Sequence, residues 1–187
     1  MKEGTIFLQH NRKWSKWYEN LVTWLITKMP VKGAFIHTQE YLRGWVYEYT
    51  INGKSVARKS LRSSGAGTDN RVAGDMVREP KVPLTEEQVD KKIAWWEEQI
   101  KNGYKYGIHK LIIQLVLGLL LRPFAVLIYR WFGWEIMKSN RIWGEHCSAA
   151  VDESNKAAGW DTFPRHSEQY TTPSAFAYTD EYVTIEV

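Results

Sequence analysis

Cysteine is almost absent from this sequence, since Cys147 is the only one in 187 residues. A single cysteine excludes an internal disulfide and any zinc site built from several cysteines. No other pattern of residues indicates a metal or a cofactor, and we expect neither. The redox compartment stays open, because a lone thiol is compatible with a reducing cytosol and with a free reactive thiol elsewhere.

The N-terminus lacks the pattern of a secretion signal. Lys2 and Glu3 precede only a short apolar stretch, Thr5–Leu8, and charged Arg12 and Lys13 follow it. That stretch is too short for the apolar region of a signal peptide. We therefore expect no classical secretion route. A cytoplasmic location is the default, and a viral or phage-borne protein is the alternative.

Apolar runs long enough to span a membrane are also missing. Leu111–Leu121 is nearly all apolar, and Phe124–Tyr129 resumes the pattern after Arg122-Pro123. Each piece is too short to cross a bilayer, and joining them would bury an arginine and a proline at its centre. We expect a buried helical insertion at about 108–137. A membrane or protein partner bound through Leu111–Trp134 is the second reading, and a true span is the third.

Charge of one sign is not in large excess, because 25 Lys and Arg oppose 21 Asp and Glu, for a net charge of +4. Basic residues gather at Lys54, Arg58, Lys59 and Arg62. A solvated edge strand explains this cluster better than a nucleic-acid surface does, so no nucleic-acid partner is expected.

The length indicates one domain, 1–187, with a real core. Two turn signals, Arg43-Gly44 and Asn52-Gly53, indicate successive hairpins. Thr85 and Gln88 form a capping box that starts a helix, and Gly103 and Gly159 end helices. The pattern predicts an α+β fold with an antiparallel sheet packed against helices. The strands are expected at Gly4–Leu8, Ala34–Leu42, Trp45–Ile51, Lys54–Leu61, Val72–Val77 and Tyr182–Val187, and the helices at Trp14–Met29, Thr85–Asn102 and Cys147–Ala158.

Cys147 is the first candidate for chemistry. It lies at the predicted N-terminus of a helix, where unpaired backbone N–H groups and the helix dipole favour a thiolate. The same N–H groups stabilise an oxyanion formed nearby. The alternative is that Cys147 is simply a small buried side chain, since free cysteines are among the most buried residues.

His37 is the candidate base among five histidines. It lies in mid-strand on the face shared by Phe35, Gln39 and Tyr41, whereas His146 adjoins Cys147 but points away from it on a helix. A polar ring on the inner face of a strand has either a catalytic role or a hydrogen-bond partner in the core.

Strand pairing adds Glu48 to the candidates. A two-residue turn at Arg43-Gly44 places Leu42 opposite Trp45, and Glu48 then lies diagonally across from His37 on the same face. A carboxylate there would orient the imidazole and stabilise its charged form. Glu40 falls on the opposite face and is a poorer candidate. The alternative for Glu48 is an exposed strand residue.

Six segments, in order along the chain, are similar to motifs of one family. GTIFL looks like "GDILL", FIHTQEYL like "FSHVELYLG" and WVYEYTINGKSV like "VIEATIGKGV". LTEEQVDKKIAWWEEQIKNGYKY looks like "LTEEQ…GKPYDY", HCSAAVDESNKAAGWDTFP like "YCSELVAEALRAAGIDLFP" and TPSAFAYTD like "SPGDLAESP". The chain thus resembles the circularly permuted papain-like hydrolases of the NlpC class, in which the strand carrying His precedes the helix carrying Cys.

The resemblance implies a permuted papain-like fold, with Cys147 as nucleophile at a helix N-terminus, His37 as general base, Glu48 as third catalytic member and Tyr104 as a support for the oxyanion. It implies a thiol hydrolase that cleaves an amide of murein (peptidoglycan) peptide through a thioacyl intermediate. It extends to the lecithin:retinol acyltransferase group, so a lipid amide or ester hydrolase or acyltransferase at a membrane surface is the second reading. A non-catalytic partner-binding module is the third.

Overall fold

The computed structural model describes residues 1–10, 35–49, 57–60, 74–103, 147–163, 171 and 173–186. The described residues form six strands and three helices. In chain order these are β1 (Thr5–His10), β2 (Phe35–Leu42), β3 (Trp45–Tyr49), β4 (Ala57–Ser60), β5 (Met76–Pro80), α2 (Glu86–Asn102), α5 (Cys147–Ala157), α6 (Pro173–Tyr178) and β6 (Tyr182–Ile185).

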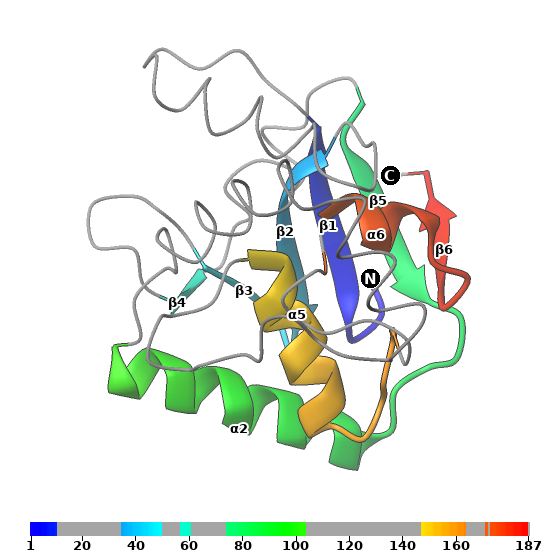
Figure 1. Cartoon of the computed structure of the whole chain (residues 1–187). Helices are drawn as coiled ribbons and strands as arrows, with labels where there is room; N and C mark the ends of the chain where they lie inside the picture. The colour runs from blue at the N-terminus through cyan, green and yellow to red at the C-terminus, as the bar shows by residue number, and fades with distance from the viewer. Residues whose placement is uncertain are drawn as a thin grey trace, which may run out of the picture.

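The strands make one antiparallel sheet in the order β4-β3-β2-β1-β5-β6. α5 packs against β2 and β3, α6 packs against β1 and β2, and α2 runs beside α5 (Figure 1). The expected α+β class, with an antiparallel sheet packed against helices, is confirmed.

The β2–β3 hairpin closes through the predicted two-residue turn. Arg43 has φ 46 and Gly44 has φ 79, and two successive positive φ values define the turn that matches strand twist. Leu42 pairs with Trp45, so the predicted register is confirmed. The Arg43 side chain is held by Glu86 at 2.9 Å and Asp90 at 2.8 Å, which ties the turn to α2.

α2 begins and ends as its sequence predicts. Thr85 Oγ1 accepts the backbone N–H of Gln88, and the Gln88 side chain accepts the N–H of Thr85. Gly103 closes the helix in the left-handed conformation at φ 60. Of the expected inner stripe, Val89 and Trp96 are fully enclosed, while Ile93 and Ile100 pack half-buried against the core.

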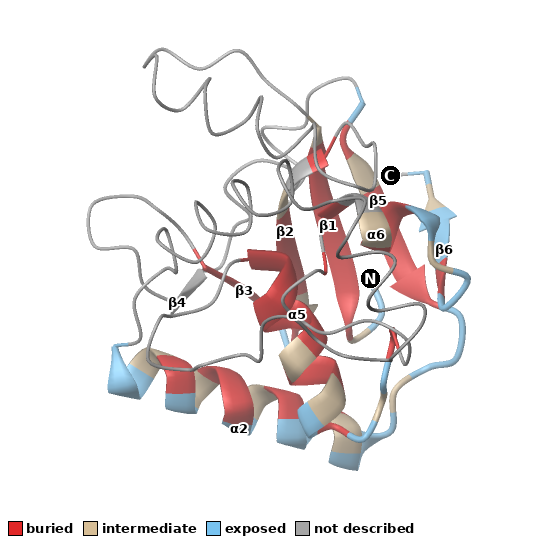
Figure 2. Cartoon of the chain, in the orientation of Figure 1, coloured by how far each residue is buried: buried red, intermediate tan, exposed pale blue. Residues whose placement is uncertain are grey.

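The main core lies between the sheet and the helices. Trp96 of α2 is its largest buried side chain and stacks on Tyr47 and Tyr49 of β3, with ring centroids 5.7 and 5.9 Å apart. A smaller cluster of Phe7, Val46 and Val77 lies on the opposite face of the sheet. Alternate residues of one strand therefore face two apolar layers, and β1, β2, β3 and β5 are buried along most of their length (Figure 2).

A buried ion pair ties three elements together inside this core. Lys92 of α2 and Glu40 of β2 are both fully buried, with Nζ 2.5 Å from Oε1. Glu40 Oε2 also accepts Trp96 Nε1 and Ser154 Oγ, each at 2.8 Å, and Lys92 donates to Asn155 Oδ1. Ser154 and Asn155 belong to α5, so the charged pair joins β2 to both helices.

The C-terminal part differs from the sequence expectation. Residues 173–178, for which the sequence predicted neither a helix nor a strand, form α6. β5 runs over Met76–Pro80 rather than Val72–Val77, because its bounds follow its pairing with β1 and β6. The expected helix Trp14–Met29 and the apolar insertion at about 108–137 lie outside the described residues. Within the described ranges, no helix has the length and apolarity needed to cross a membrane.

Arg78 fixes the chain end to the sheet, and its loss should weaken the fold. Its guanidinium donates to the carbonyls of Phe176 at 2.6 Å, Thr179 at 3.0 Å and Tyr182. Arg78→Met should lower the free energy of unfolding by about 3 kcal/mol, because it leaves buried carbonyls without their charged donor. Urea unfolding measures this. Arg43→Met, which removes an exposed arginine, is the control, and an equal loss there would contradict the assignment.

Candidate active site

Cys147 is the first residue of α5 and is 3% exposed. The first turns of this helix are anchored by Thr171. Ser148 Oγ donates to the Thr171 carbonyl at 2.6 Å, and Thr171 Oγ1 donates to Asp152 Oδ2 at 3.0 Å. The helix start predicted for Cys147 is confirmed, and neighbouring side chains hold it in place.

His37 lies in β2 directly after a β-bulge. Gln9 of β1 pairs with His37, but the next residue, His10, pairs with Phe35, so Ile36 is an extra residue in β2. A bulge bends a strand and increases its twist, and bulges are frequent beside active sites because they re-aim side chains. Here the bulge directly precedes His37, whose side chain neighbours the Cys147 thiol.

The Cys147 thiol and the His37 imidazole are neighbours, and each shifts the pKa of the other through its charge and through side-chain hydrogen bonding. Backbone hydrogen bonding from Thr38 and Ser148 also lowers the pKa of the Cys147 thiol. The His37 side chain is 17% exposed, so the ring is screened from most solvent but not sealed off. Residues distant in sequence therefore surround the sulfur with hydrogen-bond donors.

Glu48 completes a chain of hydrogen bonds. Its Oε2 lies 2.8 Å from His37 Nε2, and the carboxylate is fully buried. The alternative of an exposed strand residue is therefore wrong for Glu48. Because Nε2 is occupied by Glu48, Nδ1 is the ring nitrogen that remains for Cys147.

The electrostatics favour a charged pair over two neutral groups. Burial alone would raise the pKa of the Cys147 thiol, but the neighbouring His37 charge and hydrogen bond, with the two backbone N–H groups, lower it. Burial would lower the pKa of His37, but the thiolate and Glu48 outweigh it and raise the pKa to about 10. A thiolate beside an imidazolium is an activated nucleophile at neutral pH.

One buried polar contact of this site was not anticipated from the sequence. Gln39 Nε2 donates to the same Glu48 oxygen at 2.5 Å, and the Gln39 side chain is fully buried. The signal was present, because the predicted register placed Gln39 opposite Glu48. A glutamine at an inward strand position needs a partner.

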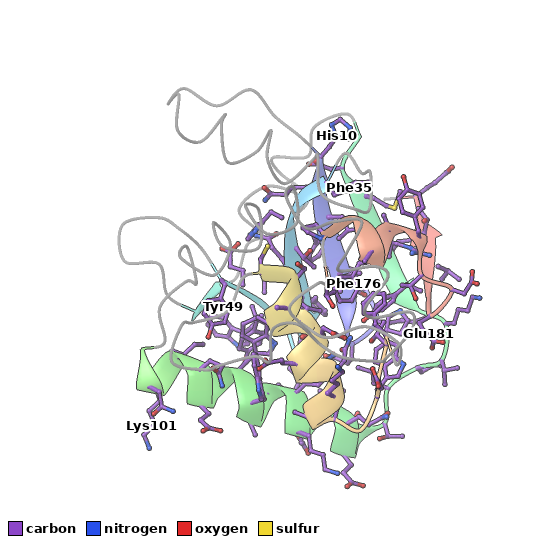
Figure 3. The ribbon with its side chains drawn as sticks, viewed as in Figure 1. His10, Phe35, Tyr49, Lys101, Phe176 and Glu181 are labelled. Atoms are coloured by element: carbon purple, nitrogen blue, oxygen red, sulfur yellow. The ribbon has the colours of Figure 1, made fainter. Side chains whose placement is uncertain are left out.

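The remaining sequence candidates are either outside the described residues or away from Cys147. Tyr104 and His146 are outside the described residues, so the expected oxyanion role of Tyr104 stays a prediction. His10 lies at the end of β1, edge-on to Phe35 with ring centroids 6.0 Å apart (Figure 3). Glu40 is buried away from His37, in the ion pair with Lys92. Among the described residues, no group of three or more His, Cys, Asp or Glu could hold a metal ion.

Comparisons with known proteins add little to this geometry. No family model matches the sequence, and no curated protein does. Solved structures that match include one described as the crystal structure of metalloprotein yiiX from Escherichia coli O157:H7, DUF1105, with 13% sequence identity and a TM-score of 0.46. That match covers 99% of this chain and 96% of the other. A similarity this low does not define a family.

Proposed function

We propose that this protein is a thiol hydrolase of permuted papain-like fold, with Cys147 as nucleophile, His37 as general base and Glu48 as the group that orients His37. The observation that carries the proposal is the continuous chain from the Cys147 thiol through His37 to the buried Glu48 carboxylate. A cysteine kept only for packing would need neither a histidine on its sulfur nor a carboxylate behind that histidine.

The chemistry is acyl transfer in two steps. The Cys147 thiolate attacks the carbonyl carbon, and the oxyanion is stabilised by backbone N–H groups at the start of α5 and, in the proposed scheme, by Tyr104. The imidazolium of His37 gives its proton to the leaving amine as the carbon–nitrogen bond breaks, which leaves a thioacyl enzyme. His37 then takes a proton from water, whose oxygen attacks the thioester and releases the acid and the thiolate.

The proposed substrate is an amide of murein peptide, which rests on the resemblance of the six motifs alone. The test incubates the purified protein with soluble murein fragments and, separately, with phosphatidylcholine vesicles. New amino termini should appear from murein with the wild type and not with Cys147→Ala. Mass spectrometry should find an acyl group on Cys147.

The outcomes separate the chemistry from its substrate. Acylation of Cys147 by the vesicles alone would keep the thiol hydrolase and replace the murein peptide by a lipid. An absence of cleavage and of any Cys147 adduct with both substrates would contradict the proposal.

Glu48→Gln should reduce turnover while preserving the fold. The substitution keeps the shape of the side chain but removes the charge that stabilises the His37 imidazolium. We expect the pKa of His37 to fall by at least about one unit, which corresponds to about a tenfold change in the proton equilibrium. NMR titration of the His37 ring measures it. Glu97→Gln, which changes a glutamate of α2 that accepts from Tyr47 at 3.3 Å, is the control and should leave both turnover and titration unchanged.

A further inference from the structure

The Glu48 carboxylate is held by a second residue of its own sheet. Its Oε2 accepts Gln39 Nε2 at 2.5 Å and lies 2.8 Å from His37 Nε2. Gln39 and His37 are alternate residues of β2 and therefore project to the same side of the strand. Both Gln39 and Glu48 are fully buried. One oxygen atom thus receives the catalytic imidazole and a neutral amide together.

We propose that Gln39 is a positioning residue that keeps Glu48 ionised and aimed at His37. This inference rests on the proposed function of the Cys147 site. We assign Gln39 a positioning role and not a catalytic one, because its fully buried amide donates to the Glu48 carboxylate and acts through it.

The physical reason lies in where the shared proton resides. A buried histidine and carboxylate in contact can hold one proton on either partner, as imidazolium with carboxylate or as imidazole with carboxylic acid. A hydrogen bond donated to the charged form of a carboxyl favours that form. The Gln39 amide therefore favours the carboxylate and leaves the proton on His37, where it stabilises the Cys147 thiolate.

A neutral donor suits this task better than a charged one. An arginine or lysine at position 39 would also hold the carboxylate, but its charge would repel the His37 imidazolium and weaken the pair. The amide adds a donor and no net charge. It also fixes the carboxylate, which reduces the freedom of Oε2 to turn away from His37.

The test follows the titration of Cys147 rather than hydrolysis. Because the chain has a single cysteine, protein labelled with 13C at cysteine Cβ gives one cysteine signal, whose shift reports thiol or thiolate at each pH. Gln39→Met keeps the chain length of the side chain and removes the donor. We expect the Cys147 pKa to rise by about one unit, a roughly tenfold loss of thiolate at the wild-type midpoint.

Two comparisons distinguish positioning from packing. Gln99→Met removes another buried glutamine, a residue of α2 that accepts a hydrogen bond from the Tyr49 hydroxyl at 3.2 Å. This variant should leave the Cys147 titration unchanged. In a Glu48→Gln background, Gln39→Met should add no further shift, because Gln39 acts through the carboxylate. If Gln39→Met fails to fold, Gln39→Asn is the second variant. It keeps an amide but shortens the side chain by one methylene, so the amide no longer reaches Glu48. The Cys147 pKa should then rise by the same amount.

The result that would overturn the inference is an unchanged Cys147 titration in the folded Gln39 variant. An equal shift from Gln99→Met, or an equal further shift in the Glu48→Gln background, would overturn it as well. These outcomes are distinct from a failure of the proposed function. That failure would appear in the wild type itself, as a Cys147 that titrates at or above the pKa of an ordinary thiol.

Discussion

Glu40→Gln is expected to lower the free energy of unfolding by about 3–5 kcal/mol, the cost of removing one partner of a buried ion pair. The substitution leaves the Lys92 ammonium fully buried without its carboxylate. It also replaces the charged acceptor of Trp96 and Ser154 by a neutral one. Unfolding in urea, followed by tryptophan fluorescence, measures the change.

The loss should depend on pH in a defined direction. Burial already lowers the pKa of Lys92 below its ordinary value, and removal of Glu40 lowers it further. The unfolded chain then binds more protons than the folded one, so stability rises with pH. The loss of unfolding free energy caused by Glu40→Gln should therefore become smaller as the pH approaches 10.5, the ordinary pKa of lysine.

Two variants test whether the ion pair is the cause. Glu40→Gln with Lys92→Met removes both charges and should recover a large part of the stability, because no unpaired charge remains buried. Lys91→Met, which removes the neighbouring exposed lysine of α2, should change stability little. A double variant as unstable as Glu40→Gln alone would contradict the role given to the pair.

His37→Ala should lower the rate of hydrolysis by about 1,000-fold, within the range usual for loss of a general acid and base. The variant removes the proton donor for the leaving group and the charge that stabilises the thiolate. It should still fold, since the ring is partly exposed and the main core does not contain it. The rate of acyl release from a murein peptide measures the effect, with circular dichroism as the check on folding.

The matched control for this variant is His10→Ala, the other histidine of the described residues. His10 lies at the end of β1, and its own backbone N–H is bound to Asp75 Oδ1 at 2.8 Å. Its removal should leave hydrolysis within a few fold of the wild type. If both variants lose activity equally, then His37 has no special role.

Much of the site could be predicted because its signals are local. The Arg43-Gly44 turn sets the β2–β3 register, and the register alone places Glu48 beside His37. The capping box at Thr85 and the helix start at Cys147 likewise depend on neighbouring residues. Turns and caps are determined by a few consecutive side chains, so sequence is sufficient to find them.

Other features could not be predicted because they depend on distant partners. The bulge at Ile36 exists only in relation to β1. Helical spacing places Lys92 between Val89 and Trp96 on the buried face of α2. A lysine is expected in a core only when its counter-charge is known. That counter-charge is Glu40, which lies far upstream in the sequence. The sequence interpretation of Glu40 was that it is the poorer partner for His37. In the structure, Glu40 instead forms a buried ion pair with Lys92 in the core.

The most direct test of the Cys147–His37 pair is the pH dependence of alkylation by iodoacetamide, which reacts with the thiolate and has one cysteine to modify. We expect folded wild type to react at pH 6–7 faster than the urea-unfolded chain. The rate should stay level through neutral pH and change again only near the His37 pKa of about 10. His37→Ala should abolish this plateau. A folded wild type that reacts more slowly than the unfolded chain at neutral pH, and no differently from His37→Ala, would contradict the account.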